Sequence, residues 1–179
     1  MLKNEITSAD NNNNTDEWIT DLIELVEKEI STFQSFLDSL TQLQQSVING
    51  NLNGIEDGSE RAGELLSTAK AISSKRQEKV MNLASANQLQ TELVTLEQVI
   101  PYVETKYRER LRALRTTLLT TLNKVKSSSK ATRRLLAHSL NYVEENLNLM
   151  VLRNPNIDSY SRKDVLKNTS QLSKFLQAS

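Results

Sequence analysis

A long apolar stripe near the start of the chain predicts an amphipathic helix. Between Trp18 and Val47, apolar side chains recur at every third or fourth position, which is the spacing that places them on one face of an α-helix. Asn14 and Glu17 form a capping-box-like pair and predict a helix start at Asn14 or Thr15. Such a long helix is stabilised mainly by packing its apolar face, so it requires a partner helix. The stripe consists of Trp18, Leu22, Val26, Ile30, Phe33, Phe36, Leu40, Leu43 and Val47.

The segment from Asn49 to Gly54 predicts the turn that leads to this partner. Asn and Gly tolerate the left-handed backbone of helix ends and tight turns, and all 4 glycines lie between residues 50 and 63. A second helix is predicted from Glu56 to about Leu83. Its expected inward-facing residues are Leu65, Leu66, Ala69, Ile72 and Val80.

The second half of the chain carries a longer apolar repeat. A short helix is expected to end before Pro101, because the residue that precedes a proline disfavours the α conformation. From Tyr102 to Met150 the repeat then continues for about fifty residues, as one helix. Between Lys126 and Arg134, Ser and Thr replace the apolar residues. Either the helix is interrupted there or, as we favour, it continues and a polar layer crosses the seam. The apolar residues of the short helix are Leu89, Leu93, Leu96, Val99 and Ile100.

The pattern changes again near the C-terminus. Asn154-Pro155-Asn156 ends the long helix, and Ser161 with Asp164 predicts the start of a final amphipathic helix. Its apolar side consists of Val165, Leu166, Leu172, Phe175 and Leu176. The predicted organisation is a disordered polar N-terminus over 1–14, a helical bundle over 15–153 and an amphipathic tail over 154–179. The fold class is therefore all-α: an elongated antiparallel helical bundle or coiled coil with long helices and a C-terminal amphipathic helix.

Composition supports one soluble helical domain. A chain of 179 residues with 37% hydrophobic content can bury one modest core, and 4 Gly and 2 Pro favour helix over sheet. No Cys is present, which excludes disulfides and cysteine nucleophiles and fits a reducing compartment. The N-terminus lacks the pattern of a secretion signal, and no apolar window is long enough for a membrane span. We therefore expect a cytoplasmic protein without membrane insertion.

Charge is segregated along the chain although the net charge is zero. Residues 1–64 contain 13 acidic and 3 basic side chains, whereas residues 104–134 contain 10 basic and 2 acidic ones. The basic block is compatible with a nucleic-acid footprint. We favour a basic helix that packs beside an acidic one, because aromatic residues for base stacking are scarce. No nucleic-acid partner is expected.

Residues that would carry out catalysis are nearly absent. The lone His138 has no Cys or second His near it in the sequence, so a solvated or hydrogen-bonded role is favoured over metal ligation. The pairs Glu27/Glu29 and Glu144/Glu145 have spacings that point away from one another on a helix, which predicts solvated faces. We expect no enzyme activity, catalytic residue, cofactor or metal site.

The order of these elements resembles the FlgN-type flagellar export chaperones, which escort hook-filament junction subunits to the type III export gate. In that family a Gly-containing turn is followed by a helix with a Leu-Leu pair and a later Arg. The matching residues here are Asn49-Gly50-Asn51-Leu52, then Glu60, Leu65-Leu66 and Arg76.

The long helix of the family carries two Asn residues before a Leu-Leu pair. Here Ser129 and Thr132 precede Leu135-Leu136, so the Asn pair is missing and the layer is still polar. Ser139-Leu140 and Tyr142-Val143 follow as in the family. Tyr160 occupies the place of a family Tyr, without the Gly that often follows it. The resemblance implies that Tyr160 helps to dock the protein on the export gate; packing of its ring on the bundle is the alternative.

The resemblance implies a cytoplasmic chaperone that binds hook-associated flagellar proteins through amphipathic helices and delivers them to the export gate. The expected client-binding residues lie on the distal long helix and on the tail. A structural coiled coil that forms homo-oligomers, or a regulatory bundle without an export client, is the alternative, and each apolar set can also be intramolecular core. The expected client-binding residues are Leu136, Leu140, Val143, Leu147, Met150, Val165, Leu166, Leu172, Phe175 and Leu176.

Overall fold

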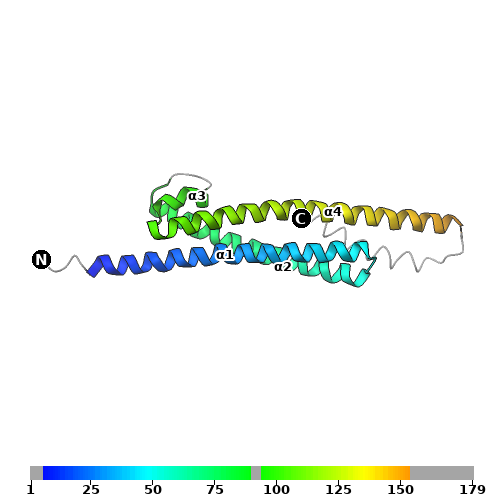
Figure 1. Cartoon of the computed structure of the whole chain (residues 1–179), viewed down its shortest axis with the longest axis horizontal. Helices are drawn as coiled ribbons and strands as arrows, with labels where there is room; N and C mark the ends of the chain where they lie inside the picture. Colours follow the sequence, from blue (N-terminus) through cyan, green and yellow to red (C-terminus); the bar gives the residue numbers. More distant parts are fainter. Residues whose placement is uncertain (1–5, 90–93, 154–179) are drawn as a thin grey trace. The chain divides into compact units, whose positions relative to one another are not determined.

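A computed structural model describes residues 6–89 and 94–153, with side chains for residues 16–89 and 94–149 (Figure 1). Three long helices carry most of this part of the chain, and it contains no strand. The predicted all-α class is confirmed. The elements are α1 (Ile6–Ile48), α2 (Leu52–Ala86), α3 (Leu96–Val99), the 3₁₀ helix η1 (Ile100–Tyr102) and α4 (Thr105–Arg153).

The first two helices begin earlier than predicted. Helix α1 starts at Ile6, so residues 6–14 are helical where a disordered N-terminus was expected. Extension of an existing helix gains a backbone hydrogen bond for each residue, whereas only nucleation is costly. Helix α2 starts at Leu52 because the Asn51 side-chain oxygen accepts a hydrogen bond from the Gly54 amide at 3.1 Å. The turn is therefore shorter than the predicted segment, and Gly50 adopts the left-handed conformation with φ of 63°.

The short helix before the long one is smaller than predicted. Helix α3 covers only Leu96–Val99, and Leu89 lies outside any helix. The start of α3 is fixed by a cap, in which the Thr95 amide donates to the Gln98 side-chain oxygen at 2.8 Å. Pro101 belongs to η1, which follows directly.

Helix α4 is continuous, as favoured from the sequence. It passes through the Lys126–Arg134 stretch without interruption. Thr132 is buried and accepts a hydrogen bond from Gln44 Nε2 at 2.7 Å, while its own hydroxyl donates to the Ser128 carbonyl at 2.9 Å. The hydroxyl is thus satisfied without a break in the helix, and the predicted polar layer is present.

The chain divides into two compact units. Unit 1 comprises residues 1–34 and 67–123, and unit 2 comprises residues 35–66 and 124–179. In unit 1, α1 contributes Leu22, Val26 and Ile30 to a core shared with α2, α3 and the first half of α4. Trp18, the first residue of the predicted stripe, is only half-buried. The other buried apolar residues of unit 1 are Ile19, Phe33, Ala69, Ile72, Val80, Ala84, Val94, Leu96, Val99, Ile100, Val103, Leu111, Leu114 and Leu118.

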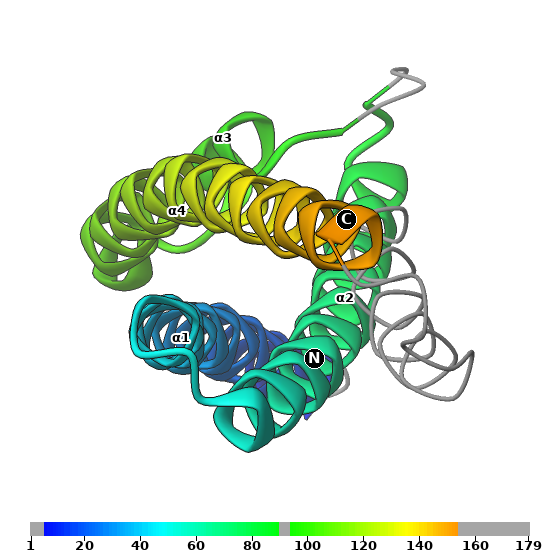
Figure 2. The same cartoon turned by 90° about the vertical axis from the view of Figure 1, so that its right-hand side faces the viewer.

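In unit 2, the tight turn reverses the chain between α1 and α2, as the end of the bundle in Figure 2 shows. One core cluster consists of Phe36, Leu40 and Ala62, with Leu65, Leu66 and Val125 packed against it. A second cluster joins the hairpin to α4 and consists of Leu43, Val47 and Leu136, with Ile55 and Leu135 packed against it. The α1 stripe predicted from Leu22 to Val47 is buried throughout. No helix in the described residues has an apolar stretch that would cross a membrane.

Candidate partner-binding surface on unit 2

Leu136 is the last fully buried residue of α4 among the described side chains. It is 2% exposed and packs against Leu43 and Val47 of α1. Between residues 137 and 149 no side chain of α4 is fully buried, although the helix continues to Arg153. The end of α4 thus extends beyond the core that holds it to the hairpin.

The apolar stripe of α4 continues past Leu136. Leu140, Val143 and Leu147 follow at helical spacing and therefore lie on the same face as Leu136. Leu140 and Leu147 are half-buried, and Val143 is 41% exposed. We call these three residues the distal α4 face.

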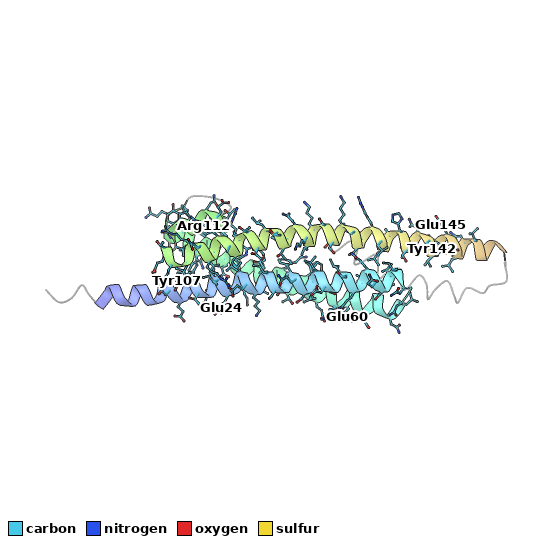
Figure 3. All side chains as sticks on the ribbon, in the orientation of Figure 1. Glu24, Glu60, Tyr107, Arg112, Tyr142 and Glu145 are labelled. Atoms are coloured by element: carbon cyan, nitrogen blue, oxygen red, sulfur yellow. The ribbon has the colours of Figure 1, made fainter. Side chains whose placement is uncertain are left out.

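Two further large apolar side chains of distal α4 are exposed, on a different side of the helix. Tyr142 is 69% exposed and Leu149 is 57% exposed, and Figure 3 shows Tyr142 on the distal part of α4. Both were missed as candidate binding residues, because helical spacing places them away from the stripe, on the side of the helix that carries His138 and Glu145. The signal in the sequence is a large apolar residue on the polar side of an amphipathic helix.

The end of the α1–α2 hairpin adds another exposed apolar pair. Ile48 is 64% exposed and Leu52 is 67% exposed, on either side of the turn. Their neighbours Val47 and Ile55 belong to the cluster that contains Leu136. The hairpin end therefore lies next to the start of the distal α4 face. In the sequence, Leu52 belongs to the turn motif, and Ile48 lies outside the apolar stripe of the first helix.

The opposite side of distal α4 also carries polar residues. His138 and Glu145 are exposed there, and Figure 3 labels Glu145 on this helix. Glu144 is exposed at the edge of the apolar side, one turn after Leu140. In the described part of the chain, no group of three His, Asp or Glu side chains is arranged to hold a metal ion. Distal α4 thus has a continuous apolar stripe on one side, which is the arrangement that docks helices against partners, and a mixed polar and apolar side opposite it.

Ion pairs link acidic α1 to basic α4 in unit 1. Lys106 Nζ donates to Asp16 at 2.6 Å, and Arg110 binds Glu27. The hydrogen bond to Asp16 is the main cause that raises the pKa of Lys106 above its usual value. These contacts confirm that the basic helix packs beside an acidic one in this unit.

The interpretation of Glu29 as a solvated residue is wrong. Glu29 is 1% exposed and forms an ion pair with Arg76 of α2. The sequence signal is its position seven residues after Leu22 and seven before Phe36, in a column that is otherwise apolar. A buried carboxylate requires a charged partner, and Arg76 supplies it.

Of the remaining predicted site residues, one is buried in the core and the others lie outside the described residues. Leu136 is a core residue, so its side chain does not lie on the surface. The side chain of Met150 lies outside the described residues, as do Tyr160 and the whole tail. The tail set consists of Val165, Leu166, Leu172, Phe175 and Leu176.

Long paired helices, an apolar core and an open amphipathic helix end define a helical protein of the partner-binding class. The family model described as FlgN protein matches residues 18–164. The chain therefore belongs to the FlgN family and is a flagellar export chaperone. The match confirms the resemblance drawn from the sequence. No curated protein and no solved structure matches the chain significantly.

Proposed function

We propose that this chain binds hook-associated proteins of the flagellum in the cytoplasm and delivers them to the export gate. The distal α4 face is the primary client surface in this proposal. The client contributes an amphipathic terminal helix, whose apolar side is covered by the chaperone until export. This is helix-to-helix recognition through apolar residues at helical spacing.

The observation that supports the proposal is the continuation of the apolar stripe beyond the core. Leu136 is the last buried residue of the stripe. Leu140, Val143 and Leu147 continue it at the same spacing, but none of the three side chains is fully buried. Exposed apolar area on one side of a helix is costly in water and favours association. The family supplies the class of partner, which is an export substrate.

Two further parts of the chain complete the proposal. The tail set contributes a second apolar contact to the client, and Tyr160 helps to dock the complex on the export gate. Tyr160 lies within the matched range of the family model, whereas the tail set begins just after it. The tail contact therefore depends on the sequence pattern of this chain.

A second copy of the chain is the alternative occupant of the distal α4 face. The exposure of Val143 is compatible with a homo-oligomeric coiled coil as well as with a client. Light scattering distinguishes the two, because a coiled coil associates without any client.

The proposal is tested by calorimetric titration of the protein with hook-filament junction subunits, full-length and without their terminal helices. Val143→Asp places a charge in the apolar contact and is expected to weaken binding roughly tenfold or more. Leu119→Asp is the matched control, because Leu119 is also on α4 and is 47% exposed. It should bind like the unmodified protein.

One-to-one binding that requires the client helix and Val143 supports the chaperone proposal. The proposal fails if no junction subunit binds and the protein is an oligomer by itself. It also fails if Val143→Asp and Leu119→Asp weaken binding equally.

A further inference from the structure

We infer that, in the free protein, residues 161–178 of the chain fold back and cover the distal α4 face, and that a client must displace them. The intramolecular contact is independent of the client, whereas the displacement step rests on the proposed function. The inference assigns an occupant to an apolar surface that the described residues leave open.

The open surface begins where the hairpin ends. Leu136 packs on Val47 in the last turn of α1, and Ile48 and Leu52 at the end of the hairpin are exposed. Beyond the hairpin end, α4 continues to Arg153 without a hairpin helix beside it (Figure 1). A helix that lies here would continue the packing that α1 provides up to Val47.

The length of the tail fits this space. Residues 137–153 of α4 extend beyond Leu136 and span about 25 Å at the usual rise per residue. A helix over residues 161–178 would span about 27 Å. The segment between them contains Asn154-Pro155-Asn156, which favours a chain reversal directly after α4. The tail can therefore return antiparallel along the same stretch of helix.

The apolar spacing of the two segments also agrees. Val165 and Leu172 are seven residues apart, as are Leu140 and Leu147. Two helices that run antiparallel with this spacing bring Val165 opposite Leu147 and Leu172 opposite Leu140. Val143 then lies one turn from the Leu172 contact.

Charge favours the same arrangement. At the edge of the distal α4 face lies the exposed Glu144, one helical turn after Leu140, whereas residues 161–179 contain four basic side chains and one acidic one. The basic residues are Arg162, Lys163, Lys167 and Lys174. A short covalent connection gives the tail an effective concentration of about millimolar at the surface. Even a weak apolar contact is then populated before any client arrives.

The absence of cysteine from the chain allows a direct test by crosslinking. Val143→Cys is combined with Leu172→Cys in the full-length protein, and a short bismaleimide reagent is added. The control combines Glu145→Cys with Leu172→Cys, because Glu145 is exposed on the opposite side of the same helix turn. Circular dichroism confirms that both double variants keep their helices.

Crosslinking within one chain is expected to be several-fold more efficient for the Val143 pair than for the Glu145 pair. Equal yields would overturn the inference, and crosslinks formed mainly between chains would assign the surface to a second copy instead. A bound junction subunit should lower the yield of the Val143 pair. If it binds and leaves the yield unchanged, the displacement step is wrong. If no subunit binds, the proposed function fails while the intramolecular contact still stands.

Discussion

Arg76 Nε donates a hydrogen bond to a carboxylate oxygen of Glu29 at 2.5 Å, and this ion pair joins α2 to α1 inside the core of unit 1. The guanidinium also donates to Ser73 Oγ at 3.1 Å. Glu29 is 1% exposed, so its charge depends on Arg76 for compensation. The pair occupies a layer of the helix seam that apolar residues fill on either side, which fixes how α1 and α2 align.

Loss of Arg76 should destabilise the protein strongly. Arg76→Met leaves the Glu29 carboxylate buried without its partner, and the free energy of unfolding is expected to fall by roughly 3 kcal/mol. Urea unfolding followed by circular dichroism measures this change. The double variant Glu29→Leu with Arg76→Met should regain most of the lost stability, because an apolar pair needs no compensation. A double variant that is as unstable as the single one would show that the charge pair is not the cause.

Two glycines of α2 should respond differently to alanine. Gly63 lies in the helix interior with no atom within 4 Å of an added Cβ, so Gly63→Ala is expected to stabilise the protein by about 0.5–1 kcal/mol. At Gly58 an added Cβ would lie 3.3 Å from the Leu43 Cβ atom, which offsets the gain in helix propensity. Thermal unfolding of both variants tests this difference. Equal stabilisation by both would mean that α2 does not approach α1 closely at Gly58.

The polar layer between Gln44 and Thr132 should contribute modestly to stability. Thr132→Val removes the acceptor for the Gln44 amide, and a loss of about 1 kcal/mol is expected. The combination of Thr132→Val with Gln44→Leu removes both polar groups and should be close to neutral. A double-mutant cycle by urea unfolding measures the coupling between the two residues. Strict additivity of the two single effects would contradict a direct interaction.

The ion pair of Lys106 should depend on salt and on alkaline pH. The pKa of Lys106 is raised, chiefly by its hydrogen bond to Asp16, so its contribution to stability is complete at neutral pH. It is lost only as the pH rises through this raised pKa. Because both side chains are partly exposed, the effect of Lys106→Gln should be small and should diminish in high salt. Unfolding curves at neutral and strongly alkaline pH, each at low and high salt, test the assignment. A loss of stability in Lys106→Gln that is equal at both pH values would contradict it.

Much of the fold follows from the periodicity of the sequence. The stripe from Leu22 to Val47 is buried as predicted, and the long repeat after Tyr102 forms one helix that ends near the predicted Asn-Pro-Asn break. These features are local, because helical spacing alone places the apolar residues on one face. The prediction of a polar layer at Thr132 is also confirmed, since Ser and Thr replace the large apolar residues at that point of the stripe.

The ends of helices were predicted less well, for a physical reason. The start of α2 depends on the cap formed by Asn51, and the start of α3 on the contact between Thr95 and Gln98. Single hydrogen bonds of this kind decide at which residue a helix begins. Helix propensity alone does not distinguish between several neighbouring start positions. The early start of α1 at Ile6 reflects the same difficulty, since an Asn-rich segment is a weak helix former but extends a helix that already exists.

Residue spacing and residue type along the chain are enough to show that it is all-α, that its helices are long and amphipathic, and that it resembles the FlgN family. Burial, in contrast, depends on how the helices pack. The packing shows that Glu29 is buried against Arg76 and that Leu136 is core whereas Val143 is exposed. Glu29 and Val143 both lie at positions compatible with either a core or a surface. The reason is that burial depends on where the neighbouring helix ends, and the α1–α2 turn ends the hairpin beside Leu136.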